Sequence, residues 1–205
     1  MSEVREDWYP NGKLAKRASY NDNKLDGLLE KWYENGQLKE RSNWKDGESN
    51  GLDEEWYPNG QLRIRINYKD GDLDGLAEEW YESGQLCSRC TYKNGELDGL
   101  SEWWYENGQL KERSNWKDGE ADGLYEDWYE NGKAMSRINY KNDLKEGLTE
   151  EWYENGQLRF HGNYKDGKRD GVFEEWHENG QLLERCTYKD GKLVAISQHK
   201  EKHND

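Results

Sequence analysis

Adjacent carboxylates are the first residues in this sequence that could do chemistry. Glu54-Glu55 and Glu150-Glu151 each supply the two acidic groups that a general acid–base mechanism uses. Both carboxylates of such a pair must reach one substrate. If these residues lie in β-strands, however, neighbours point to opposite faces of the sheet. We therefore predict that neither pair is catalytic.

Cysteine and histidine are the next candidates. Cys87 and Cys90 have the C-x-x-C spacing of zinc and redox sites. Residues three apart in a strand also face opposite sides, and Cys90 and Cys186 occupy a position that other repeats fill with small residues, so we predict buried packing. His161 and His177 replace a recurring arginine and a recurring tyrosine. We expect no metal site, no cofactor and no enzyme activity.

The elements that carry these residues repeat along the chain. Tryptophan occurs at positions 8, 32, 56, 80, 104, 128, 152 and 176, and a second aromatic residue recurs with the same period of 24 from position 20 to position 188. A fixed period of this size marks an array of stacked repeats. The repeats are predicted at 4–27, 28–51, 52–75, 76–99, 100–123, 124–147, 148–171 and 172–195. Residues 196–205 are expected to form a charged capping strand or tail.

Each repeat holds two short runs of alternating residues between two glycine-containing turns, which predicts a β-hairpin. Pro10 and Pro58 in the first turn favour a three-residue loop that ends in a left-handed glycine. This loop pairs Trp32 with Leu38. We predict the same geometry for the turn at 45–47, which would pair Trp44 with Glu48. The glycines with this structural role are Gly36, Gly60 and Gly108.

This register makes a prediction about the two faces of the sheet. Across both predicted loops, even-numbered residues pair with even-numbered residues. All even-numbered residues should therefore lie on one buried, aromatic and aliphatic face. The expected fold is all-β, an elongated and curved single antiparallel meander. Structural roles are predicted for the tryptophans Trp32, Trp56, Trp80, Trp104, Trp128 and Trp152, and for the glutamates Glu54, Glu78, Glu102, Glu126 and Glu150.

The recurring glutamates have two interpretations. As structural groups, they would accept hydrogen bonds from indole or backbone N–H groups on the buried face. As a functional group, they would form an acidic stripe for a cationic partner. A column of arginines, which includes Arg41 and Arg65, should lie on the outer face and pair diagonally with Glu55 and Glu79.

Composition limits the classes of partner. The chain has 205 residues, of which 36% are charged, and its net charge is −14. This acidic balance argues against binding to nucleic acids or to anionic lipids and favours cationic partners. Because no apolar run could span a membrane or act as a signal peptide, we expect a soluble, cytoplasmic protein.

The repeat resembles a known family. The pattern GLxEEWYENGQLxxRxNYKDGxLDG is similar to the MORN repeat, in the variant common in bacteria, and it recurs eight times over residues 4–195. The resemblance implies a rod or half-pipe of β-hairpins that serves as a binding or scaffold module without catalysis. Bacterial chains of this variant are often described as antitoxin or immunity proteins. The stretch KNDLKEG departs from the pattern, because Asp143 stands in place of the turn glycine.

Apolar residues that interrupt the charged outer columns are the candidates for partner binding. The predicted register places Trp103 and Tyr125 on either side of Lys111, with Met135 diagonal to Tyr125 and Cys87 diagonal to Trp103. We predict that these five residues form an exposed patch with aromatic anchors. The alternative is incidental variation. The function that follows is binding and neutralising a basic, toxin-like protein, and the alternative function is a self-associating scaffold.

Overall fold

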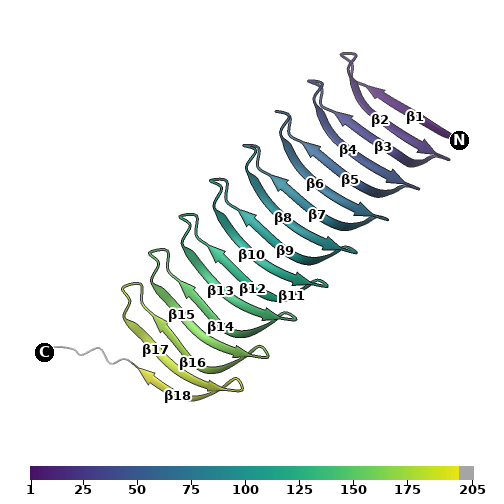
Figure 1. Cartoon of the computed structure of the whole chain (residues 1–205). Helices are drawn as coiled ribbons and strands as arrows, with labels where there is room; N and C mark the ends of the chain where they lie inside the picture. The colour runs from purple at the N-terminus through teal and green to yellow at the C-terminus, as the bar shows by residue number, and fades with distance from the viewer. Residues whose placement is uncertain (199–205) are drawn as a thin grey trace. The chain divides into compact units, whose positions relative to one another are not determined.

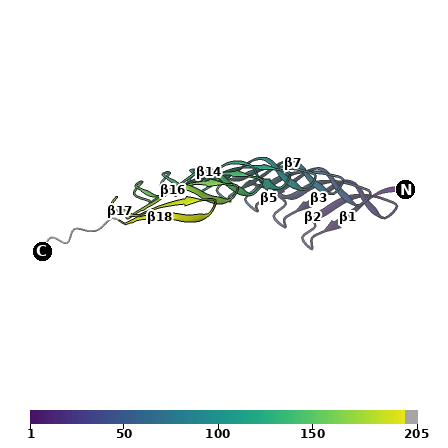
Figure 2. The same cartoon turned by 90° about the horizontal axis from the view of Figure 1, so that it is seen from below.

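The computed structural model describes residues 1–198, and these residues fold entirely into β-strands and turns, with no α-helix. The chain divides into two compact units, Met1–Gly108 and Gln109–Asp205. In each unit the strands follow one another in chain order as an antiparallel meander of hairpins (Figures 1 and 2). The all-β class and the antiparallel meander predicted from the sequence are confirmed.

The first unit contains nine strands, each of which pairs with the next along the chain. They are β1 (Ser2–Trp8), β2 (Leu14–Asn21), β3 (Lys24–Trp32), β4 (Leu38–Lys45), β5 (Glu48–Trp56), β6 (Leu62–Lys69), β7 (Asp72–Trp80), β8 (Leu86–Lys93) and β9 (Glu96–Trp104).

The described part of the second unit also contains nine strands. They are β10 (Leu110–Lys117), β11 (Glu120–Ala121), β12 (Gly123–Trp128), β13 (Ala134–Lys141), β14 (Leu144–Trp152), β15 (Leu158–Lys165), β16 (Lys168–Trp176), β17 (Leu182–Lys189) and β18 (Lys192–Gln198). The short β11 and β12 both pair with β10, so together they occupy the place of one strand. Of the predicted capping segment, β18 includes residues up to 198, and residues 199–205 lie outside the described range.

The first turn of each repeat follows the prediction. The Tyr33 N–H donates to the Gln37 carbonyl at 2.8 Å, and the Gly36 N–H donates to the Tyr33 carbonyl at 2.8 Å. Gly36 has a φ of 95°, in the left-handed region that favours glycine. Gly60 and Gly108 make the equivalent bonds to Tyr57 and Tyr105. The sequence therefore predicted this loop correctly from the position of proline.

The second turn differs from the prediction. Lys45 pairs with Glu48 and Trp44 with Ser49, so the loop has two residues and not three. Asp46 and Gly47 both have positive φ angles, 52° and 92°. That combination is typical of a type I′ hairpin, which suits the Asp-Gly sequence and the right-handed twist of the strands. The predicted pairing of Trp44 with Glu48 is wrong for this reason.

A β-bulge follows the first turn, and it overturns the predicted faces. Trp32 pairs with Leu38, but the next pair is Lys31 with Glu40, which leaves Lys39 as an extra residue. Beyond a bulge of one residue, odd- and even-numbered residues exchange the faces of the sheet to which they point. Odd-numbered residues of β3 therefore share a face with even-numbered residues of β4.

The corrected register defines two faces. The first, which we call the tyrosine face, carries the second aromatic column and the small residues beside it, and in the first unit it includes Leu29, Ser42, Trp44, Ile66, Ala77, Cys90 and Tyr92. The second, which we call the arginine face, carries the arginine and glutamate columns with Leu28 and Leu76. Leu29 is 3% exposed and Leu28 is 38% exposed, so the tyrosine face holds the better-buried side chains.

Pairs of adjacent repeats are joined through the tyrosines of the first turn. The Tyr33 hydroxyl donates to the Trp56 carbonyl at 2.7 Å, and the Tyr57 hydroxyl donates to the Trp80 carbonyl at 2.8 Å. In the second unit, the Tyr129 hydroxyl reaches the Trp152 carbonyl at 2.8 Å. Each hydroxyl satisfies a carbonyl 23 residues ahead, which fixes the stacking distance between repeats. The predicted structural tryptophans are half-buried at these junctions.

Candidate functional site

The recurring glutamates lie on the arginine face, where arginine neutralises most of them. Arg41 bonds Glu30 at 2.9 Å, and Arg89 bonds Glu78 at 3.0 Å. The predicted diagonal pairing of this arginine column with Glu55 and Glu79 on one face is wrong, because the bulge moves those two glutamates to the tyrosine face. The equivalent pairs in the structure are Arg17–Glu6, Arg65–Glu54, Arg137–Glu126 and Arg185–Glu174.

These pairs favour a structural role for the glutamate column, but the partner is arginine and not the predicted indole or backbone N–H. Each carboxylate that has an arginine beside it on the same sheet face is already compensated, and the Glu54 side chain is only 13% exposed. Glu78 and Glu102 are buried. In the seventh repeat His161 replaces the arginine and lies opposite Glu150, and its Nδ1 is 3.2 Å from Glu174. Because its carboxylates are already neutralised, this column would attract a cationic ligand only weakly.

The residues of the predicted patch are divided between the two units. Cys87 and Trp103 lie in the first unit, and the other three lie in the second. Towards β10, Glu112 pairs with Asp127 and Arg113 with Glu126, so Tyr125 does not lie opposite Lys111. On the other side Tyr125 pairs with Ile138, and its ring packs edge-on against Tyr140 at 6.1 Å. The predicted pairing of Tyr125 with Lys111 is therefore wrong.

Two further patch residues sit at bulges. Asp127 pairs with Ser136 and Trp128 with Ala134, so Met135 is the extra residue of β13, and it is half-buried. Cys87 holds the equivalent position in β8, and a hydrogen bond with its thiol raises the pKa of Tyr81 to about 12. Phe173, an apolar residue of the eighth repeat in the same column as Tyr125, is 4% exposed and therefore belongs to the core.

Trp103 keeps the exposure that the sequence predicted. It lies on the tyrosine face of β9, opposite Ser88, and is 38% exposed. Among the described residues, its indole N–H has no hydrogen-bond partner. A large aromatic side chain that is only partly covered is a typical anchor for a protein partner.

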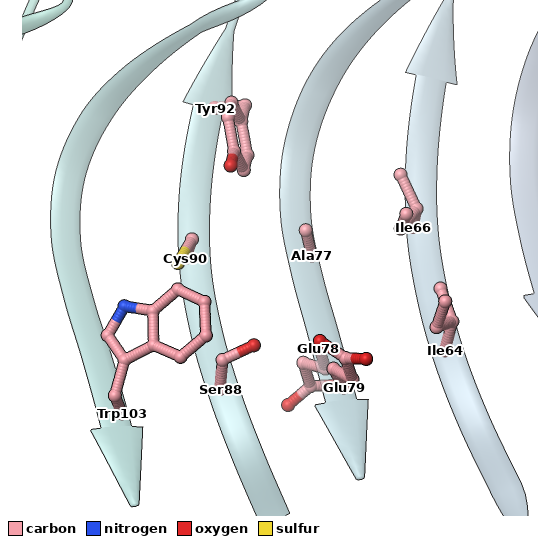
Figure 3. Close-up of a pocket in the computed structure, with 9 residues that line it drawn as sticks. All are labelled: Ile64, Ile66, Ala77, Glu78, Glu79, Ser88, Cys90, Tyr92 and Trp103. Carbon is pink, nitrogen blue, oxygen red and sulfur yellow. The ribbon is translucent and has the colours of Figure 1, made fainter. Parts of the chain in front are cut away.

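An open hollow of about 170 Å³ lies beside Trp103, entirely within the first unit (Figure 3). Two cross-strand rows form it. One row runs Ile66, Ala77, Cys90 and Ser101, and the other runs Ile64, Glu79, Ser88 and Trp103. Tyr92 closes one side.

Small side chains create this hollow. Ala77, Ser88 and Cys90 lie between the larger Ile64 and Ile66 on β6 and Trp103 on β9. Below the opening, Cys90 Sγ lies 3.1 Å from Ser101 Oγ. Burial raises the pKa of the Tyr92 hydroxyl, which lines the same space. The result is a nonpolar floor bordered by two carboxylates, Glu79 and Glu78, of which Glu78 bonds Arg89 at 3.0 Å.

The carboxylate of Glu79 lacks the ion pair that the equivalent glutamates of the third and seventh repeats have. Arg63 bonds Glu55, and Arg159 bonds Glu151 at 3.1 Å. The residue 24 positions after Arg63 is Cys87, which cannot supply a positive charge. Within the described chain, Glu79 has neither an ion-pair nor a hydrogen-bond partner.

Trp103 could be predicted from the sequence as a binding residue, whereas Glu79, Ala77 and the two isoleucines were not predicted. The signals were present in the repeat columns. Cys87 stands where Arg63 and Arg159 stand in other repeats, and Ala77 is the smallest residue of a varied column that includes Leu29, Ser101 and Phe173. Only the correct register shows that these changes meet in one place. Among residues 1–198, no group of three or more metal-ligating side chains comes together.

Comparison with known proteins identifies the repeat. The family model described as the MORN repeat variant matches residues 4–22, 25–46, 50–70, 73–94, 97–118, 121–142, 145–166 and 169–190. No curated protein matches the chain. The described part of the chain contains no helix that could cross a membrane. Eight consecutive matches over most of the sequence show that this chain belongs to the MORN repeat variant family, a fold of repeated β-hairpins that provides a non-enzymatic repeat module.

Proposed function

We propose that this chain is a non-catalytic protein-binding module that holds a basic protein partner on the tyrosine face of its first unit. The observation that carries the proposal is the partly exposed Trp103 beside an open hollow with the unpaired carboxylate of Glu79. A tryptophan in such a position can bury a large area when a partner covers it.

Charge supports a basic partner. The net charge of −14 attracts a cationic protein over long range and accelerates association in a salt-dependent way. Because arginines already neutralise most of the arginine face, the unpaired acidic group on the tyrosine face is the better local contact. Binding of this kind would neutralise a toxin-like protein by covering its basic surface, as an antitoxin or immunity protein does.

Affinity capture with three forms of the protein tests this function. The wild type, Trp103→Ala and Leu76→Ala are used as baits in extracts of the native host. Leu76 is a matched control, because it is 36% exposed and lies on the arginine face of the same unit. We expect a basic protein that the wild type and Leu76→Ala retain. Its dissociation constant should rise at least about fivefold with Trp103→Ala, which corresponds to a loss of about 1 kcal/mol.

The kinetics give a second criterion. Association of the captured protein with the wild type should slow as the salt concentration rises, while Trp103→Ala should mainly accelerate dissociation. Equal retention by the wild type and Trp103→Ala, or capture of acidic proteins alone, would contradict the proposal.

Self-association is the second candidate function, and the first strand favours it. Within the described residues β1 pairs only with β2, and its side chains Val4 and Trp8 are 61% and 58% exposed. An exposed strand edge with apolar side chains can pair with another chain. Light scattering separates the two functions, since a molar mass that rises with concentration would favour the scaffold.

A further inference from the structure

The hollow over Ala77 has features that select one kind of side chain. Its floor is nonpolar, its lining includes the carboxylates of Glu78 and Glu79, and an indole ring stands at its edge (Figure 3). Glu78 already bonds Arg89 at 3.0 Å, so Glu79 is the carboxylate that a ligand can use. Lysine has a flexible alkyl stem that packs on nonpolar surfaces and a compact ammonium that remains at the polar end.

We infer that this hollow is a pocket for a lysine side chain of the protein partner. The stem would lie on Ile64 and Ile66, and the ammonium would face Glu79 and Trp103. The inference rests on the proposed function and specifies which group of the basic partner is recognised.

The shape of the hollow depends on a missing side chain. In the repeat column that contains Ala77, the second repeat has Leu29, 3% exposed, and the eighth has Phe173, 4% exposed. Both fill the space above their own strands. With alanine, the rows on either side enclose about 170 Å³, several times the roughly 30 Å³ that one water occupies in the liquid. That space can accept an alkyl chain.

The charge at the rim depends on a second missing side chain. Arg63 and Arg159 neutralise Glu55 and Glu151 from the bulge position. Cys87 takes that position in β8, so Glu79 receives no ion pair from it. The guanidinium of Arg63 attracts Glu79 from a distance, but it is bonded to Glu55. A ligand ammonium at the rim would supply the ion pair that the third and seventh repeats make internally.

Aromatic rings contribute the third feature. The face of an indole attracts a cation within about 6 Å of the ring centre. The protein already uses this contact on its other face, where the guanidinium of Arg65 lies 5.8 Å from the Trp80 ring. Trp103 and the ring of Tyr92 border the hollow and can act on a bound ammonium in the same way.

Of the two carboxylates that line the hollow, Glu78 is held by Arg89, and the one that is left, Glu79, favours lysine over arginine. A guanidinium presents a planar fork that is best matched by two parallel acceptors. Glu79 lies in a row with Ile64, Ser88 and Trp103, none of which adds a second carboxylate. A point charge such as an ammonium needs no such match.

Titration with n-butylammonium, which has the same end group and stem as lysine, tests the pocket without a protein partner. Ligand-observed NMR on the full chain should show saturable binding in the millimolar range. Glu79→Gln, which keeps the shape and removes the charge, should raise the dissociation constant about tenfold or more. Ala77→Leu should abolish binding, because it restores the side chain that fills the equivalent space at Leu29.

Glu82→Gln is the matched control, since Glu82 is an exposed glutamate in the following turn. It should bind n-butylammonium like the wild type, and 1-pentanol, an uncharged molecule of similar size, should bind more weakly than n-butylammonium. Circular dichroism confirms that each variant is folded. If Ala77→Leu does not fold, the comparison of Glu79→Gln with Glu82→Gln decides whether the hollow binds the ammonium. An absence of saturable binding to the wild type, or equal binding by Glu79→Gln, would overturn the pocket.

The two proposals can fail separately. A basic partner that depends on Trp103 while n-butylammonium does not bind would refute the lysine pocket alone. Saturable n-butylammonium binding that depends on Glu79, with no basic partner captured, would refute the proposed function alone.

Discussion

Replacing Phe173 with alanine is expected to destabilise the second unit by about 3–5 kcal/mol, the range for truncation of a buried phenylalanine. Phe173 is 4% exposed. Its ring packs against Tyr188 at 5.1 Å and Tyr164 at 5.3 Å, and the guanidinium of Arg169 lies 5.1 Å from its centre. A Cβ added at Gly162 would lie 2.4 Å from the ring, which shows how closely Phe173 fills this part of the tyrosine face.

Denaturant unfolding of the full chain measures this effect, and Leu183→Ala is the control. Leu183 is also apolar and in the second unit, but it is 44% exposed, so its truncation should cost much less. Because repeat arrays need not unfold in one step, the comparison is made on the transition that reports the second unit. Equal losses for the two variants would show that the tyrosine face is not the core.

Asp53→Asn is expected to stabilise the protein by about 1–3 kcal/mol near pH 8. Burial raises the pKa of Asp53 from 3.8 to about 6, and the nearby carboxylates of Glu40 and Glu55 add to the rise, against a smaller opposing effect of Lys31. One carboxylate oxygen of Asp53 is buried without a hydrogen-bond partner. Ionised Asp53 is therefore a cost in the folded state, which asparagine removes without a change in shape.

The sign of the pH dependence follows from the raised pKa. Above pH 6 the aspartate is charged in both the folded and the unfolded state, and its charge disfavours the folded one. As the pH falls from about 6 toward 3.8, the folded state takes up a proton first and the cost disappears. The gain from Asp53→Asn should thus be largest at pH 8 and vanish near pH 4.

Asp72→Asn, at an exposed position of β7, serves as the control and should change stability little at either pH. The free energy of unfolding is measured for the three proteins at pH 4 and pH 8. A gain from Asp53→Asn that is the same at both values, or no gain at pH 8, would contradict this account of Asp53.

Several elements of the fold could be read from the sequence because they depend on local chemistry. The constant period gives the hairpins, and proline at the second position of the first turn gives the loop that ends in Gly36. The second turn could also have been predicted, since Asp46-Gly47 is the residue pair that type I′ turns prefer. The prediction extended the first loop to the second one and lost that signal.

The faces could not be predicted, because the bulge leaves no mark in residue type. Lys39 is an ordinary exposed lysine, yet it is the extra residue that reverses parity along β4. Leu28 was consequently expected in the core and its neighbour Leu29 outside it, whereas the structure has the reverse. In a repeat protein, one wrong register choice is copied into every repeat.

For the same reason, only part of the candidate site could be predicted from the sequence. Trp103 interrupts a charged column, which makes it visible in the sequence. The hollow needs side chains from β6, β7, β8 and β9 in two aligned rows, so it depends on three strand pairings at once. Tyr125 and Met135 show the opposite case, since similar interruptions there are half-buried parts of the sheet.

Site-specific photocrosslinking tests the central claim, that the tyrosine face of the first unit holds the partner. A photoreactive phenylalanine derivative is placed at position 103 in one protein and at position 76 in another. These positions have similar exposure, 38% and 36%, but lie on opposite faces of the same unit. Irradiation with the captured basic partner should give a covalent adduct from position 103 and little from position 76. Adducts from position 76 alone would place the partner on the arginine face and contradict the account.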